Sequence, residues 1–167
     1  MMAVHLKQLT PDDGPGIYAL AQAIPKEENG FHNSANGLSP EEFTSWLKQQ
    51  SNISQGIDLP EGWVPQTIYW LFDGDQPVGM CKLRPILSEA LLAGGGNIGY
   101  AIAPLERGKG LGKEQLRLLL QEAKKHGLAK VLITANNDNK ASIGVALANG
   151  GIIEKVSEKG HHIWINI

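Results

Sequence analysis

The chain of 167 residues carries 15 basic and 17 acidic side chains, and its formal net charge of −2 gives no overall field that would favour nucleic acid or an anionic membrane. Its single cysteine, Cys81, excludes an intrachain disulfide and a metal cluster built from cysteines. The first ten residues lack the apolar stretch of a signal peptide, and nothing approaches a membrane span in length. We therefore expect one soluble, cytoplasmic domain over residues 1–167.

The first 65 residues predict one strand and two helices joined by long loops. Residues 4–9 are typical of a strand, and the Thr-Pro-Asp-Asp start of residues 10–24 predicts a capped helix with proline in its first turn. Ser-Pro-Glu-Glu opens a second helix, over residues 39–50, with the pattern of a capping box. Loops are predicted at 25–39 and 51–65, and because loops this long are often functional, we expect both to shape a substrate site.

The remaining sequence predicts a sheet with two more helices. Two apolar runs around an Asp-Gly-Asp-Gln turn predict a hairpin. After the hairpin, β-branched runs predict further strands, and leucines at helical spacing predict a helix. The expected strands are 66–72, 77–83, 98–103, 130–135, 152–156 and 162–167, and the expected helices are 111–126 and 141–148. The order β-α-α-β-β-β-α-β-α-β-β predicts a mixed α/β fold, a largely antiparallel twisted sheet of about seven strands flanked by helices.

The most informative segment is the glycine-rich turn Arg-Gly-Lys-Gly-Leu-Gly at residues 107–112, between a predicted strand and a helix. Glycines allow positive φ and close approach of a ligand, and free N–H groups at a helix start favour a phosphate. A Walker A loop is excluded because Glu114 follows Lys113, and the G-x-G-x-G spacing excludes the dinucleotide fingerprint. The turn therefore predicts another kind of phosphorylated cofactor.

Two motifs together resemble the GNAT superfamily of N-acetyltransferases. R-x-x-G-x-G at 107–112 is similar to the pyrophosphate loop of that superfamily, and the strand at 130–135 followed by Asn139-x-x-Ser142 and a short helix is similar to its second motif. The resemblance covers residues 97–151 most strongly, and its glycine pairs are similar to a less characterised bacterial branch of predicted acetyltransferases. It implies the acyl-CoA N-acyltransferase fold, with acetyl-CoA as co-substrate.

The resemblance also implies which residues hold the cofactor. The turn would bind the pyrophosphate, Asn139 and Ser142 would border the pantetheine arm, and a main-chain N–H near Ile102 would contact the thioester carbonyl. The implied contacts are Ile102, Arg107, Gly108, Lys109, Gly110, Leu111, Gly112, Lys113, Asn139 and Ser142. Arg117 shares a helix face with Lys113 and either reaches the phosphates or belongs to a solvated surface.

The implied reaction is direct attack of a primary amine on the thioester in a ternary complex. The amine must be deprotonated, because a group with a pKa of about 10.4 is almost fully protonated at pH 7. Many family members protonate the leaving thiolate with a tyrosine seven residues after the asparagine, but that position is Ala146 here. We therefore expect either a substitute acid or water. Cys81 lies within a predicted strand, which makes it a poor nucleophile for a ping-pong route.

Tyr100 and Glu89 are the main candidates for the general acid or the general base. Tyr100 lies on the strand beside the expected cleft, and Glu89 lies between the hairpin and that strand, where it could bind or deprotonate a cationic acceptor. A half-buried strand tyrosine and a solvated glutamate are the ordinary alternatives. His32 and Asp138 are weaker candidates, and we expect no metal at His161-His162 because no third ligand lies near them in the sequence.

Two other functions stay open. The loss of tyrosine at Ala146 is compatible with a non-catalytic module that binds or senses acyl-CoA, and an interaction domain without a ligand is a further possibility. The sequence leaves the acceptor unidentified, as a small-molecule or peptide amine, with nucleic acid and membrane disfavoured by charge. It also leaves open whether the protein is a monomer or a homodimer.

Overall fold

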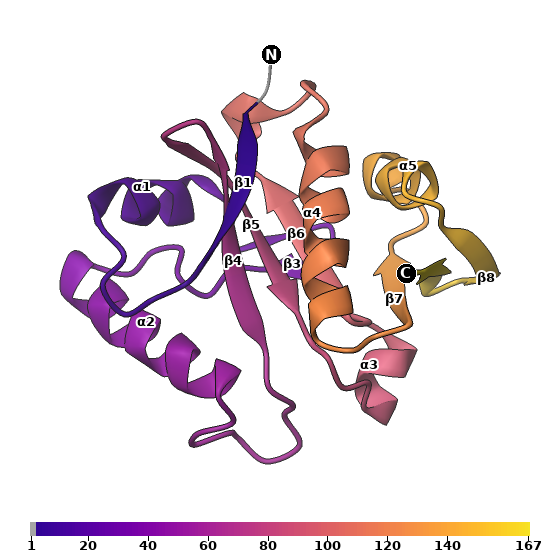
Figure 1. Ribbon diagram of the computed structural model, residues 1–167, viewed down its shortest axis with the longest axis horizontal. Coiled ribbons are helices and arrows are strands. Elements are labelled where there is room, and N and C mark those ends of the chain that lie inside the picture. The colour runs from indigo at the N-terminus through magenta and orange to yellow at the C-terminus, as the bar shows by residue number, and fades with distance from the viewer. Residues whose placement is uncertain (1–2) are drawn as a thin grey trace.

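The computed structural model describes residues 3–167 and contains two antiparallel sheets that lie edge to edge (Figure 1). One sheet has the order β1-β4-β5-β6 and the other the order β7-β9-β8. Their strands are β1 (Val4–Gln8), β4 (Thr67–Asp73), β5 (Gln76–Leu83), β6 (Ile98–Ile102), β7 (Lys130–Ala135), β8 (Ile152–Ser157) and β9 (Gly160–Asn166). The predicted class, a mixed α/β fold with an antiparallel sheet of about seven strands, is confirmed, although the seven strands form two sheets.

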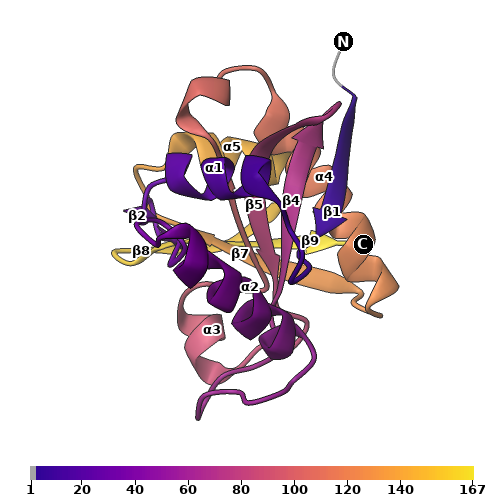
Figure 2. The ribbon, with the colours of Figure 1, turned by 90° about the vertical axis from the view of Figure 1, so that its left-hand side faces the viewer.

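Helices cover both faces of the four-stranded sheet. α1 (Pro15–Ala23) and α2 (Pro40–Ser54) lie on one face, and α4 (Leu111–Lys125) lies on the other (Figures 1 and 2). α5 (Lys140–Ala148) packs against α4, β7 and β9. Leu116, Leu119 and Ala123 of α4 recur at helical spacing and are buried, so this helix forms one core with the sheet, while a second core around Trp70 lies under α1 and α2. No helix within residues 3–167 has the length and apolar character to cross a membrane.

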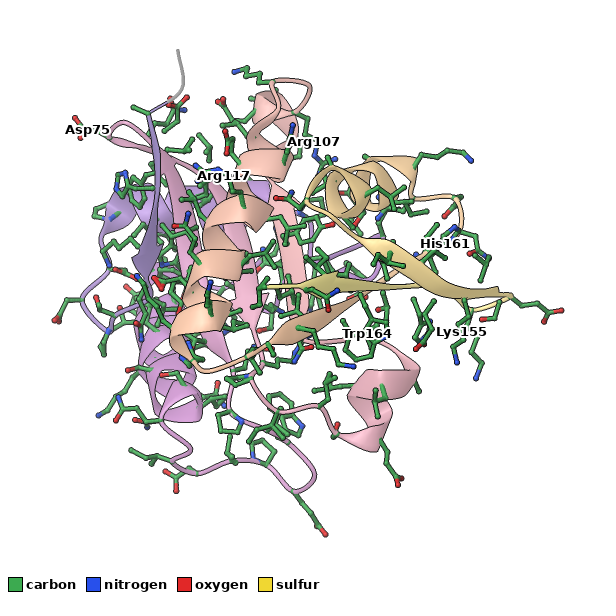
Figure 3. All side chains as sticks on the ribbon, turned by 45° about the vertical axis from the view of Figure 1, so that its right-hand side comes forward. Asp75, Arg107, Arg117, Lys155, His161 and Trp164 are labelled. Atoms are coloured by element: carbon green, nitrogen blue, oxygen red, sulfur yellow. The ribbon has the colours of Figure 1, made fainter. Side chains whose placement is uncertain are left out.

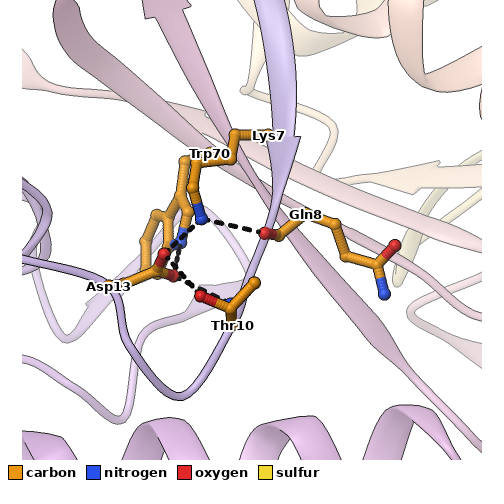
Figure 4. A network of polar contacts seen from close by, with 5 residues as sticks. All are labelled: Lys7, Gln8, Thr10, Asp13 and Trp70. Atoms are coloured by element: carbon orange, nitrogen blue, oxygen red, sulfur yellow. Dashed lines mark hydrogen bonds and ion pairs between the residues drawn. The ribbon is translucent and has the colours of Figure 1, made fainter.

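The first helix begins later than the sequence predicts. The Thr-Pro-Asp-Asp segment forms a turn, and α1 starts at Pro15 after Gly14. The reason is Asp13, whose buried carboxylate accepts hydrogen bonds from the Thr10 N–H at 3.0 Å and from Trp70 Nε1 at 2.8 Å, and also pairs with Lys7 (Figure 4). Asp13 therefore connects the β1–α1 segment to β4 and is not part of α1.

The two predicted loops are partly ordered. Residues 25–39 contain a small hairpin, β2 (Glu27–Glu28) with β3 (Phe31–His32), and residues 51–54 extend α2 beyond its predicted end. The capping box of α2 is confirmed, because the Ser39 N–H donates to Glu42 at 2.9 Å and the Glu42 N–H donates back to Ser39 Oγ at 3.2 Å. A short helix that was not predicted, α3 (Glu89–Ala93), follows β5.

One buried side chain joins the two sheets. Asn97 is only 1% exposed, and its main-chain N–H donates to the Leu132 carbonyl at 2.9 Å. Its side-chain oxygen accepts from the Leu132 N–H at 2.8 Å, and its side-chain nitrogen donates to the Arg84 carbonyl at 2.8 Å. The neighbouring Gly96 leaves no room for a side chain, since a Cβ there would lie 2.3 Å from the Leu132 oxygen. Beyond this junction, no ladder joins β6 to β7 in residues 3–167, and the sheets diverge.

The junction makes a first prediction. Asn97→Ala leaves the Leu132 N–H and the Arg84 carbonyl without their partner, so we expect the free energy of unfolding to fall by about 2–4 kcal/mol. Chemical denaturation would measure the change. Asn166→Ala, on the exposed end of β9, is the control and should change it by less than about 0.5 kcal/mol. A loss at Asn97 no larger than that of the control would contradict this role.

Candidate functional site

A cavity of about 540 Å³ opens where the two sheets diverge. We call the side formed by β6, the 106–112 turn and the starts of α4 and α5 the loop side. The hairpin side is formed by the β2–β3 hairpin, the end of β5, residues 93–95 and the β8–β9 turn. Lining residues on the loop side include Tyr100, Ile102, Arg107, Gly108, Gly110, Leu111, Gly112, Lys113, Asn139 and Ser142, and those on the hairpin side include Glu28, Phe31, His32, Lys82, Arg84, Lys159 and His162. All the predicted cofactor contacts except Lys109 therefore line one cavity.

The glycine-rich turn presents free main-chain donors to this cavity. Gly108 and Gly110 have φ values of +81° and +80°, which is the left-handed conformation that glycine adopts without a steric cost. No N–H group of residues 108–112 donates a hydrogen bond to any atom of residues 3–167. Because α4 begins at Leu111, these donors also lie at the positive end of a 15-residue helix dipole. The turn therefore has the properties of an anion site.

The basic residues near the turn differ in what they contact. Arg107 donates from Nε to the Ile102 carbonyl at 3.0 Å, and its guanidinium pairs with Glu28 of the hairpin. Lys109 pairs with Glu106 at 2.8 Å and does not line the cavity. Arg117, on α4 (Figure 3), pairs with Glu114 and also lies outside the cavity, which favours the solvated-surface alternative for it.

A pair of hydroxyl groups lies at the start of α5. Asn139 caps this helix by accepting from the Ser142 N–H at 3.3 Å. Ser142 Oγ donates to the Tyr100 hydroxyl at 2.9 Å, and that hydroxyl donates to the Ser142 carbonyl at 3.0 Å. Burial raises the pKa of Tyr100 to about 12, against a smaller opposite effect of Ser142, so Tyr100 is a neutral phenol at pH 7. Ala146, one turn further along the same face of α5, is buried and has no proton to give.

The hairpin side contains a buried lysine. Lys82 is 8% exposed, its ammonium donates to the His32 carbonyl, and it lies 4.8 Å from the centre of the Phe31 ring. Burial and the nearby Arg84 lower its pKa to about 8, while Glu27 acts weakly in the opposite direction. Within residues 3–167 no carboxylate lies within 4 Å of this ammonium. It is a buried cation without a charged partner.

Sequence analysis missed Glu28, Lys82 and Arg84 as lining residues. A usable signal existed for Lys82, because it interrupts the apolar run at 78–83 of a predicted strand, where a charge needs an explanation. Glu28 gave no such signal, since it lies in a polar segment and meets Arg107 only in the folded chain.

Several other candidates lie outside the cavity or serve the fold. Glu89 is exposed in the first turn of α3 and, like Asp138, does not line the cavity. His32 does line it and pairs with Glu27. Cys81 is fully buried in a core cluster, and burial raises the pKa of its thiol, which agrees with its exclusion as a nucleophile. His162 is 6% exposed and hydrogen-bonds the Leu92 carbonyl, so it is a buried residue of β9.

The lowered pKa of Lys82 predicts a pH-dependent contribution to stability. Between pH 8 and 10.5 the folded protein has lost the Lys82 proton that the unfolded chain still holds, so stability rises with pH in this window. Lys82→Met removes the effect. We expect the free energy of unfolding of the wild type, relative to the variant, to increase by about 2 kcal/mol from pH 7 to pH 10. Denaturation curves of both proteins would measure this, and a difference that stays constant with pH would contradict the shift.

The family model described as acetyltransferase (GNAT) domain matches residues 4–152, most of the chain. No curated protein matches the chain by sequence.

Solved structures share the fold at low sequence identity. The ribosomal L7/L12 alpha-N-protein acetyltransferase RimL, in complex with coenzyme A, is 17% identical with a TM-score of 0.71, over 98% of this chain and 94% of that one. The putative acetyltransferase yncA of Salmonella typhimurium, with acetyl-CoA, is 13% identical with a TM-score of 0.64, over 98% and 94%. The N-acetyltransferase PseH of Campylobacter jejuni, in complex with acetyl coenzyme A, is 11% identical with a TM-score of 0.64, over 98% of each chain.

Proposed function

The chain belongs to the GNAT acetyltransferase family, and we propose that this acyltransferase moves the acetyl group of acetyl-CoA to a primary amine by direct attack in a ternary complex. The main support is the set of unpaired N–H groups at residues 108–112, in a turn that lines the cavity at the start of α4. Structures similar in fold that contain coenzyme A or acetyl-CoA also support this cofactor.

The loop side fits the cofactor. The N–H groups of residues 108–112 would hold the pyrophosphate, with Lys113 adding positive charge. Arg107 would join them with the terminal N–H groups that its pair with Glu28 leaves free, since a guanidinium carries five donors. Asn139 and Ser142, at the start of α5, would border the pantetheine arm.

The open edge of β6 supplies donors for the thioester. The Ala103 N–H donates to the Val78 carbonyl at 2.9 Å, on the β5 side. Main-chain groups of a strand alternate in direction, so the N–H of Ile102 is directed away from β5, towards the diverging β7. Ile102 can therefore stabilise the oxyanion that forms when an amine attacks the thioester carbonyl.

The proposed reaction conserves atoms and charge. The nitrogen of the neutral amine forms a bond to the carbonyl carbon, the carbon–sulfur bond breaks, and the sulfur leaves as a thiolate. The proton that the nitrogen loses balances the proton that the thiolate gains, so the products are an amide and the free thiol of coenzyme A. Tyr100 is our candidate donor of that proton, since its neutral hydroxyl lines the cavity and contacts Ser142 one turn before Ala146. The sequence left a substitute acid and water as the two alternatives, and Tyr100 would be the substitute acid.

The cofactor loop can be tested at Gly110. Gly110→Asp and Gly110→Asn impose the same strain at positive φ and differ in one charge, so their comparison isolates the carboxylate. If the turn holds a pyrophosphate, the aspartate variant should bind acetyl-CoA at least 10-fold more weakly than the asparagine variant, at similar melting temperatures. Isothermal titration would measure both. Equal affinities of the two variants would place the phosphates elsewhere.

The proposed acid can be tested with Tyr100→Phe, which removes only the hydroxyl. We expect kcat to fall about 10- to 100-fold with little change in the KM for acetyl-CoA, because thiolates leave without full protonation but faster with it. The matched control is Tyr69→Phe. It removes a hydroxyl group from the same core cluster, at a residue that does not line the cavity. A kcat equal to that of the wild type would instead make water the proton donor.

A non-catalytic module that binds acyl-CoA is the second candidate, favoured by the absence of an acid at Ala146. Release of free thiol in the presence of a panel of amines separates the two functions. Tight binding of acetyl-CoA without thiol release on any amine would favour the non-catalytic module.

A further inference from the structure

The hairpin side of the cavity is positively charged, although the whole protein has a net charge of −2. Lys82, Arg84 and Lys159 line it. Its one lining carboxylate, among residues 3–167, is Glu28, which pairs with Arg107 of the loop side. Glu27 pairs with His32 and does not line the cavity. A ligand that enters from this side therefore meets cations.

Lys82 and Arg84 still have donors to offer. An ammonium carries three N–H donors, and within residues 3–167 that of Lys82 donates only to the His32 carbonyl. Arg84 donates from Nε to Gln66 at 3.0 Å and from one terminal nitrogen to the carbonyls of Gly95 and Gly96, while its other terminal nitrogen donates to no atom of the described chain. Holding a buried ammonium without a counter-ion is costly, so this position favours an anionic ligand.

We propose that the acceptor is a small amine that also carries a carboxylate, as an amino acid does, and that Lys82, with Arg84 beside it, binds that carboxylate. The inference rests on the proposed function and adds to it the class of the acceptor. A polyamine or another purely cationic acceptor would be repelled by Lys82. Among residues 3–167, both carboxylates that line the cavity, Glu28 and Glu106, are already paired with cations.

The same cations would assist the chemistry. A positive charge near an amine disfavours its ammonium form and lowers its pKa, so more of the bound acceptor is neutral and able to attack. The contact of the carboxylate with Lys82 keeps the acceptor bound while its amine is in the neutral form. Lys82 pairs across the ladder with Gly99 of β6, the strand whose open edge faces the cofactor, so an amine a few atoms from a carboxylate held by Lys82 is within reach of the thioester.

The experiment uses the wild type, Lys82→Met and the control Lys124→Met, which removes an exposed charge from the last turn of α4, outside the cavity. Each protein is saturated with coenzyme A, and its melting temperature is measured with the common α-amino acids, β-alanine and γ-aminobutyrate, each against its carboxamide. A second arm compares the peptide amides Ala-Glu and Ala-Gln, to separate a free amino acid from an acidic peptide as the source of the carboxylate. Thiol release from acetyl-CoA is then measured for every acceptor.

We expect at least one carboxylate-bearing amine to raise the melting temperature more than its carboxamide does, and to have a kcat/KM at least 10-fold higher. Lys82→Met should remove this preference and Lys124→Met should keep it. A role of Lys82 in folding alone would lower stability without changing the ratio between acid and amide.

Preference for carboxamides or polyamines, or no carboxylate-dependent effect in either arm, would overturn the proposal. So would a preference that survives in Lys82→Met. Failure of coenzyme A itself to raise the melting temperature would instead contradict the proposed function, so the two failures can be told apart.

Discussion

The contact between Asn97 and Leu132 fixes how the two sheets meet, and the cavity depends on it. At this point both the main chain and the side chain of Asn97 bond to one residue of β7, so the sheets are held together at one end. Past it, no ladder forms between β6 and β7 within residues 3–167, so the Ile102 N–H on this edge of β6 has no strand partner. A strand edge with unpaired donors inside a protein is costly unless a ligand uses them. The same junction that joins the sheets therefore creates an edge suited to a bound thioester.

Local requirements explain which parts of the fold and the site could be predicted. The turn at residues 107–112 needs glycine at positive φ, and α4 needs leucines at helical spacing, and both demands are visible in a short window of sequence. The capping box of α2 is equally local. These features, together with the Asn-x-x-Ser segment, were sufficient for the family and for the loop side of the cavity.

Long-range contacts explain what could not be predicted. Asp13 lies in the first turn of the helix predicted at residues 10–24, but its carboxylate binds Trp70 and Lys7 instead, and α1 starts at Pro15. The hairpin side is built from segments around residues 28, 82, 94 and 160, which no local pattern relates to one another. The one expected sheet forms as two, and the asparagine that joins them has partners 13 and 35 residues away in the sequence.

The charges of the cavity show why net charge predicts little about a site. The chain is nearly neutral, yet among residues 3–167 the two carboxylates that line the cavity are paired, Glu28 with Arg107 and Glu106 with Lys109, and the nearby Glu27 pairs with His32. Pairing neutralises the carboxylates while leaving Lys82, Lys113 and the N–H groups of the turn available. Both sides of the cavity are therefore electropositive: the donors are main-chain groups at a helix start on the loop side, where we propose a phosphate, and a buried ammonium on the hairpin side, where we propose a smaller anion. An acceptor bound to the hairpin side in this way would have its amine directed towards the loop side, so binding and positioning would follow from one distribution of charge.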